Sequence, residues 1–302
     1  MKVVVLAGGF GGARFARAMA ENAEDVTIVG NVGDDTEILG LHISPDLDSI
    51  LYALTGLGDE ERGWGRRDET WNALDTVAAL GGETWFQLGD RDLGLHLVRT
   101  QALRSREPLS AVTTRLAAVL GVEAALLPAT DDTLRTWVET PAGDFPFQDW
   151  YVGRGHRDEV TGVRYEGDAQ AAPGVLEALE AADLIALAPS NPYLSIGPIL
   201  VVPSIRAALE RRREPAVAVS PLIGGRTVKG PADRMLARFA GGTEPKHVAG
   251  CYEGLIDALV LDEADDPGDL DVTPIVTRTL MTDAAARRRL AEAVLDVALA
   301  RR

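Results

Sequence analysis

Short aliphatic runs alternate with segments of helical pattern along most of the chain, and this alternation limits the folds that it can adopt. Each run is continuously apolar, as strands buried on both faces of a sheet are, and the helical segments supply the crossovers that parallel strands need. The predicted strands are residues 3–7, 26–31, 84–88, 124–127, 184–188, 216–220 and 255–262, and the predicted helices are residues 13–23, 44–54, 91–103, 204–213 and 282–300. The predicted N-caps of three of these helices are Ser44, Asp90 and Thr282. We therefore predict an α/β fold, Rossmann-like and doubly wound, with a mostly parallel sheet.

One stretch departs from this regular alternation. Residues 99–173 show weaker periodicity, and residues 139–152 within them resemble a hairpin that turns at Pro141-Ala142-Gly143. We predict a single domain over residues 1–302, in which about residues 99–173 form an inserted smaller subdomain.

Charge and cysteine content exclude several classes of function. The chain has 30 basic and 46 acidic residues, hence a net charge of −16, whereas a nucleic-acid partner requires a basic face. Its apolar runs are far shorter than the ~20 residues that cross a bilayer. The single cysteine, Cys251, permits neither an intramolecular disulfide nor a cysteine-based zinc site. We expect a cytoplasmic protein that binds neither nucleic acid nor membrane.

A glycine-rich loop follows the first predicted strand and opens a helix. Its members are Gly8, Gly9, Gly11 and Gly12, with Arg14 close behind. Glycines let the backbone approach a phosphate, which the free N–H groups of a helix N-terminus bind. The loop lacks the Walker lysine, and the third glycine of the dinucleotide fingerprint is replaced. A tight turn without a ligand is the alternative interpretation.

Acidic residues gather at two further places. Asp34 and Asp35 follow the second strand together with Asn31, at the edge where doubly wound sheets bind ligands. Asp46 and Asp48 lie in the first turn of a predicted helix, where they either cap the helix or act chemically. In the chemical interpretation such carboxylates bind Mg²⁺ or deprotonate an alcohol. The candidate metal ligands are Asp35 and Asp46, and the candidate catalytic residues are Asp46 and Asp48.

Other predicted strand ends carry further polar residues. Gln87, Asp90, Arg91 and His96 form one candidate group, although a structural i, i+4 pair with Asp92 is the simpler explanation for His96. Two later loops add candidate phosphate-binding residues, namely Ser190, Asn191 and Lys229. Lys229 is the best candidate among the lysines for a contact to phosphate.

Taken in order, these motifs resemble one family. The segments GGFGG, NVGDD, SPDLD, GWGRRDETW, WFQLGDRD, LPATDD, FQDWYV, APSNPYLSIGPI and VSPLIGG with KGPA extend from about Met1 to Ala232, with a weaker echo at residues 280–282. Their order and content are similar to the 2-phospho-L-lactate transferase family, CofD of archaea and FbiA of actinobacteria. The resemblance implies an Mg²⁺-dependent reaction in coenzyme F(420) biosynthesis. It also implies a homodimer.

The reaction implied by the resemblance joins two small molecules. The donor is a guanylylated three-carbon acid, such as lactyl-2-diphospho-5′-guanosine or its enolpyruvyl counterpart. The acceptor is Fo, 7,8-didemethyl-8-hydroxy-5-deazariboflavin, whose ribityl hydroxyl attacks phosphorus and releases GMP. This gives F(420)-0 or dehydro-F(420)-0.

The resemblance also assigns roles to particular residues. Residues 8–12 would cradle the donor diphosphate, together with the donor-binding candidates Arg14, Asn31, Ser190, Asn191 and Lys229. Asp48 would contact Fo, as would Gln87, Asp90, Arg91 and His96. Gln87 departs from the family, which has lysine or an acid at that position, and this weakens the case for a charged contact to Fo there.

Two other functions stay open at this point. A non-catalytic nucleotide-sugar sensor shares the glycine loop, and the SPDLD and GWGRRDETW segments argue against it. An NAD(P)-dependent oxidoreductase lacks support because the acid that would hold a ribose hydroxyl is missing after the second strand. No motif distinguishes lactate, enolpyruvate and glycerate as the donor acid.

Overall fold

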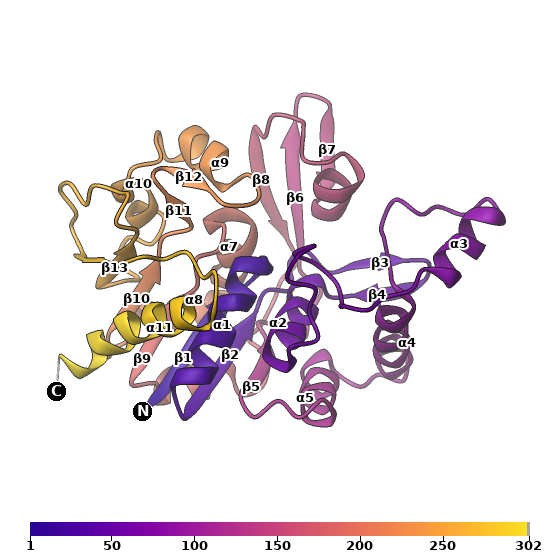
Figure 1. The fold of residues 1–302 in the computed structure, drawn as a ribbon, viewed down its shortest axis with the longest axis horizontal. Helices are drawn as coiled ribbons and strands as arrows, with labels where there is room; N and C mark the ends of the chain where they lie inside the picture. The colour runs from indigo at the N-terminus through magenta and orange to yellow at the C-terminus, as the bar shows by residue number, and fades with distance from the viewer. Residues whose placement is uncertain (301–302) are drawn as a thin grey trace.

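The computed structural model describes residues 1–300, and a parallel sheet forms the centre of that part of the chain (Figure 1). Seven strands lie in the order β14-β13-β10-β9-β1-β2-β5, and each neighbouring pair is parallel. Their bounds are β1 Lys2–Ala7, β2 Asp25–Gly30, β5 Ala125–Pro128, β9 Leu184–Leu187, β10 Ala216–Val219, β13 Ala258–Leu261 and β14 Thr273–Val276. The strand order reverses between β1 and β9, as in doubly wound sheets. The predicted Rossmann-like fold is confirmed.

Helices cover both faces of the sheet because alternate residues of each strand point to opposite sides. In β1, Val3 and Val5 join one hydrophobic core, while Val4 and Leu6 join the other. The first core contains residues of α1 Gly9–Asn22, α2 Pro45–Thr55, α4 Asp90–Arg104, α5 Leu109–Val119 and α11 Ala284–Leu299. The second contains residues of α6 Val175–Ala181, α7 Gly197–Leu200, α8 Pro203–Arg211, α9 Ala232–Phe239 and α10 Pro245–Gly250.

Smaller elements lie beyond the carboxyl ends of the strands (Figure 1). One of them is an antiparallel sheet in the order β7-β6-β8. The π-helix η1 lies between β7 and β8 along the chain, and a second π-helix, η2, follows β9 of the main sheet. The bounds are β6 Arg135–Thr140, β7 Gly143–Pro146, β8 Gly162–Glu166, η1 Asp149–Gly153 and η2 Pro192–Ile196. The remaining elements are β3 Thr36–Ile38, β4 Leu41–Ile43, α3 Asn72–Ala79, β11 Leu222–Ile223 and β12 Arg226–Thr227. Residues 99–173 therefore contribute both to the main sheet, through β5, and to the small one.

Several local expectations were wrong. Residues 84–88 form no strand; they follow α3 as an irregular segment without a neighbouring strand to pair with. The predicted hairpin is present as β6 and β7, which pair across the turn after Thr140, but its second strand ends at Pro146 and η1 follows where the strand was expected to continue. Asp283, not Thr282, caps α11 by accepting a hydrogen bond from the Ala286 N–H at 2.8 Å.

No single helix within residues 1–300 is both long and apolar enough to span a bilayer, and one pair bent by 87°, Pro192–Leu200 with Pro203–Arg211, passes by length and composition only.

Candidate active site

A cavity of about 890 Å³ opens at the carboxyl ends of the central strands, where the strand order reverses. The loop after β1 supplies its floor, and loops after β2, β9 and β10 supply further walls. Doubly wound sheets bind ligands at this position because adjacent loops diverge there and leave a crevice. The cavity is therefore the candidate active site.

Most of the residues predicted from the sequence meet in this cavity. Those that line it are Gly8, Gly9, Gly11, Arg14, Asp46, Asp48, Gln87, His96, Ser190, Asn191 and Lys229. Those that do not line it are Gly12, Asn31, Asp35, Asp90 and Arg91.

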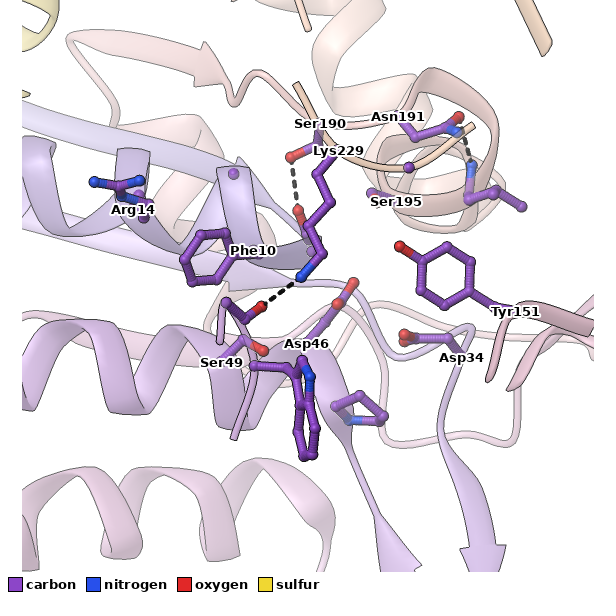
Figure 2. Close-up of a pocket in the computed structure, with 18 of the residues that line it drawn as sticks. Phe10, Arg14, Asp34, Asp46, Ser49, Tyr151, Ser190, Asn191, Ser195 and Lys229 are labelled. Atoms are coloured by element: carbon purple, nitrogen blue, oxygen red, sulfur yellow. Dashed lines mark hydrogen bonds between the residues drawn. The ribbon is translucent and has the colours of Figure 1, made fainter. Parts of the chain in front are cut away.

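The glycine loop packs too closely against its neighbours for side chains. A Cβ atom on Gly8 would lie 2.5 Å from the Asp46 carboxylate, and one on Gly12 would lie 2.5 Å from the Ser190 hydroxyl. That hydroxyl donates a hydrogen bond to the Gly8 carbonyl at 2.7 Å (Figure 2). Gly9 has a φ of +67°, which favours glycine. Gly12 therefore serves the packing of α1 against the β9 loop, whereas Gly8, Gly9 and Gly11 face the cavity.

Two buried carboxylates, Asp34 and Asp46, share one amide. The Asn31 Nδ2 group donates to Asp46 Oδ2 at 2.9 Å and to Asp34 Oδ1 at 3.2 Å. Burial raises the pKa of Asp46 to about 6, although the hydrogen bonds from Asn31 and Gly9 act against this rise. Burial and the neighbouring Asp46 and Asp35 charges raise the pKa of Asp34 well above its usual range. Two carboxylates this close repel each other, so the pair is stabilised by a bound cation or by a proton that the two groups share.

The predicted metal ligand Asp35 points elsewhere. Its Oδ2 atom accepts hydrogen bonds from the Ser44 hydroxyl at 2.7 Å and from His42 Nε2 at 2.9 Å. The sequence predicted that Ser44 caps α2. Its side chain makes no capping hydrogen bond, because its hydroxyl donates to Asp35 instead. Asp34, the neighbour that the sequence did not single out for a metal, is the one that lines the cavity.

Asp48 belongs to a buried network beside the cavity. Both of its carboxylate oxygens accept hydrogen bonds from Arg99, and one of these contacts, from Nη1 to Oδ2, is 2.9 Å long. His96 lies between two carboxylates, with Nδ1 3.7 Å from Asp48 and Nε2 3.4 Å from Asp92. The Tyr52 hydroxyl donates to Asp92 at 2.5 Å. Asp48 is thus held in one orientation, which a capping role would not require.

The N-termini of α3 and α4 are each capped by a carboxylate from another segment of the chain. Glu69 accepts hydrogen bonds from the backbone N–H groups of Arg91 and Asp92 at 2.8 and 2.9 Å, at the start of α4. Asp90 in turn accepts from the N–H groups of Asn72 and Ala73, at the start of α3. The sequence predicted that Asp90 caps the helix that it precedes, which is α4. In the structure its side chain caps α3 instead. The hydrogen bond from the Thr70 hydroxyl, followed by those from Ala73 and Asn72, lowers the pKa of Asp90 to about 2.

The roof of the cavity contains residues that sequence reasoning had not selected. Directly before the GWGRRDETW segment, which is residues 63–71, the Arg62 guanidinium carbon lies 4.8 Å from the Trp64 ring centroid and 5.3 Å from that of Trp71. The Gly63 carbonyl accepts a hydrogen bond from Lys229 Nζ at 3.0 Å, which joins the two rims of the cavity. The family-like motif was the available signal, because Gly63 and Trp64 lie inside it and Arg62 directly precedes it. All three residues line the cavity.

Aromatic side chains form a second wall. Phe147 stacks on Tyr151 with centroids 5.2 Å apart, and Tyr151 stacks on His156 at 4.8 Å. Trp85 and Phe86 line the same cavity. Planar rings offer stacking surfaces for a heterocycle.

Comparison with known proteins decides the family. The profile of the family described as 2-phospho-L-lactate transferase CofD matches residues 3–279. The chain belongs to the CofD family. This CofD-family chain is 42% identical over 313 residues to a protein of Streptomyces griseus named phosphoenolpyruvate transferase, covering 99% of the chain and 98% of that protein. It is 40% identical over 324 residues to the phosphoenolpyruvate transferase of Mycolicibacterium smegmatis, covering 99% of each.

Solved structures support the fold. A Bacillus halodurans protein of the UPF0052 family superposes on this CofD-family chain with a TM-score of 0.63 at 18% identity, covering 97% of the chain and 98% of its own length. The resemblance to the family seen in the sequence is confirmed by the profile and the relatives, and a transferase is the activity that their names share.

Proposed function

We propose that the chain acts in coenzyme F(420) biosynthesis and transfers an enolpyruvyl phosphate group from enolpyruvyl-2-diphospho-5′-guanosine to the ribityl hydroxyl of Fo. The products would be dehydro-F(420)-0 and GMP. One observation carries the proposal: relatives named phosphoenolpyruvate transferase match 99% of the chain at 40–42% identity. The family name favours a lactyl donor as the second candidate.

The donor diphosphate fits the glycine loop. α1 has 14 residues and begins at Gly9, so its positive end faces the cavity. Arg14 and Lys229 line the same end and add positive charge. In a chain of net charge −16, such local positive groups are needed to hold a diphosphate.

Asp34 and Asp46 fit a magnesium ion. Burial raises the pKa of both carboxyl groups, and the Asp46 charge raises the pKa of Asp34 further; a bound cation would reverse these shifts. Within residues 1–300 no cluster of three or more His, Cys, Asp or Glu side chains could hold a metal. Two carboxylates suffice for Mg²⁺ when substrate phosphates and water complete its shell. Bound there, the ion would neutralise charge on the diphosphate.

Asp48 faces the acceptor in this scheme. The ribityl oxygen attacks the phosphorus that bears the acid, the bond from that phosphorus to the bridging oxygen breaks, and GMP leaves with that oxygen. Asp48, fixed by Arg99, accepts the hydrogen bond and then the proton of the attacking hydroxyl. The planar deazaflavin packs against Trp85, Phe86 and Tyr151.

Product mass spectrometry tests the proposal. The enzyme is incubated with Fo, Mg²⁺ and one guanylylated acid at a time, and GMP release is followed in parallel. We expect the enolpyruvyl donor to give the fastest GMP release and dehydro-F(420)-0. A dominant lactyl product would favour the second candidate. Binding of GDP without release of GMP from any donor would identify a sensor instead. Light scattering on the same preparation tests the expected homodimer.

A further inference from the structure

Phe10 is the one bulky side chain in the Gly8–Gly12 loop. It is partly buried and lines the cavity, and it belongs to none of the hydrophobic cores. A small residue would fit a phosphate loop as well, so packing of the core does not explain the phenyl ring.

Two cations flank this ring. The Arg14 guanidinium carbon lies 5.6 Å from the Phe10 ring centroid, and Lys229 Nζ lies 5.5 Å from it. Figure 2 shows Phe10 between the two side chains. Arg14 follows Phe10 by four residues on α1, so the helix itself brings the pair together. Lys229 comes from the loop between β12 and α9, on the opposite rim.

Neither cation has a carboxylate partner among residues 1–300. Within the part of the chain that the structure describes, Arg14 Nε is buried without a hydrogen-bond partner, and Lys229 Nζ donates only to the Gly63 carbonyl. Burial lowers the pKa of Lys229. Burial and the Arg287 and Arg17 charges lower the pKa of Arg14, although Glu60 acts the other way. Two incompletely compensated cations beside a helix N-terminus make a site for an anion.

We propose that Phe10 is a positioning residue for the donor: its ring holds Arg14 and Lys229 on its two sides, so that both cations meet the diphosphate of a guanine nucleotide at the start of α1. The proposal rests on the proposed function, because it takes the donor to be a nucleoside diphosphate ester. Within about 6 Å of a ring centroid, a cation is attracted by the aromatic quadrupole, which Leu lacks. Phe10 thereby orients charges that it does not itself carry.

Calorimetry with GDP and Mg²⁺ tests this role in the full-length protein. Without the aromatic ring neither cation is held in its place, and we predict about tenfold weaker GDP binding by Phe10→Leu. Phe10→Tyr keeps a ring and should bind GDP within about threefold of the unmodified protein. Phe239→Leu is the matched control, since no cation lies over that ring among residues 1–300, and its GDP affinity should not change. Fo affinity should be unchanged in Phe10→Leu, which a general collapse of the cavity would not allow.

A double-mutant cycle decides whether Phe10 acts through the cations. Arg14→Gln should weaken GDP binding at least threefold less in the Phe10→Leu background than in the unmodified protein, because the guanidinium is already misplaced there. If the two effects multiply instead, or if Phe10→Leu binds GDP normally, the positioning role is wrong. If Phe10→Leu is unfolded, Phe10→Met replaces it in the cycle with the same expectation. Failure of the unmodified protein to bind GDP would contradict the proposed function itself.

Discussion

Replacing Asp48 by asparagine should destabilise the fold far more than the loss of a helix cap would. Asp48 and Arg99 are 4% and 2% exposed, and both carboxylate oxygens accept hydrogen bonds from the guanidinium. Removing one member of a buried ion pair leaves the other charge uncompensated, at a cost of about 3–5 kcal/mol. A capping role alone would cost about 0.3–1 kcal/mol.

The two magnitudes give distinguishable melting curves. With an unfolding entropy of about 2.1 cal/mol/K per residue, a chain of 302 residues has roughly 0.6 kcal/mol/K in total. Loss of the buried pair then lowers Tm by roughly 5–8 °C, whereas loss of a cap lowers it by less than about 2 °C. Asp158→Asn is the control, because its pair with Arg154 lies at the surface and its loss should leave Tm nearly unchanged.

A double variant separates stability from catalysis. Asp48→Leu with Arg99→Met replaces the ion pair by apolar side chains of similar size, which should restore most of the lost stability. If Asp48 also meets the attacking hydroxyl, GMP release should stay at least about 10²-fold slow in the restored protein. An Asp48→Asn protein that melts within about 2 °C of the parent would refute the buried-pair argument. Normal GMP release by the double variant would remove Asp48 from the reaction.

Three further expectations follow from the site. Asp46→Asn should raise the Mg²⁺ concentration needed for half-maximal GMP release, and added metal should partly restore turnover, because one of two proposed ligands loses its charge. Gly12→Val should cost about 1–3 kcal/mol in urea unfolding, since its Cβ would lie 2.5 Å from the Ser190 hydroxyl, whereas Gly11→Val, whose Cβ would lie 3.0 Å from the Pro189 carbonyl oxygen, should lose less stability and lose GDP binding. Asp90→Asn should lower Tm at pH 7, and the difference from the parent should shrink as pH falls from about 4 towards 2. The sign follows because the Asp90 pKa is lowered from 3.8 to about 2 by the folded state, so its stabilisation exists above the unfolded pKa and disappears below the folded one.

Each of these has an outcome that would contradict it. An unchanged Mg²⁺ requirement in Asp46→Asn would remove that carboxylate from the metal site. A Gly12→Val protein as stable as Gly11→Val would show that the tight contact relaxes at no cost. A Tm difference for Asp90→Asn that stays constant from pH 7 to pH 2 would mean that its charge does not stabilise α3.

The sequence predicted the sheet well because its strands are buried on both faces. Runs such as residues 184–188 and 216–220 are apolar throughout, and this pattern depends on no distant contact. It also located the cavity, since glycines and acids at the ends of parallel strands converge at one edge. Residues 84–88 show the limit: an apolar run with Trp and Phe favours a strand, but here these rings line a ligand cavity instead.

Pairings between distant residues were decided only by the tertiary structure. The sequence places Asp34 beside Asp35, but which of the two faces the cavity depends on His42 and Ser44, which hold Asp35 away from it. Likewise, Asp90 caps α3 because Glu69 already accepts the hydrogen bonds at the N-terminus of α4, the helix to which Asp90 belongs. A local pattern fixes backbone periodicity over a few residues, whereas the direction of a charged side chain depends on partners from other parts of the chain. The amino-acid sequence thus determined the family, the sheet and the edge of the sheet where the cavity lies, and folding determined which carboxylates meet there.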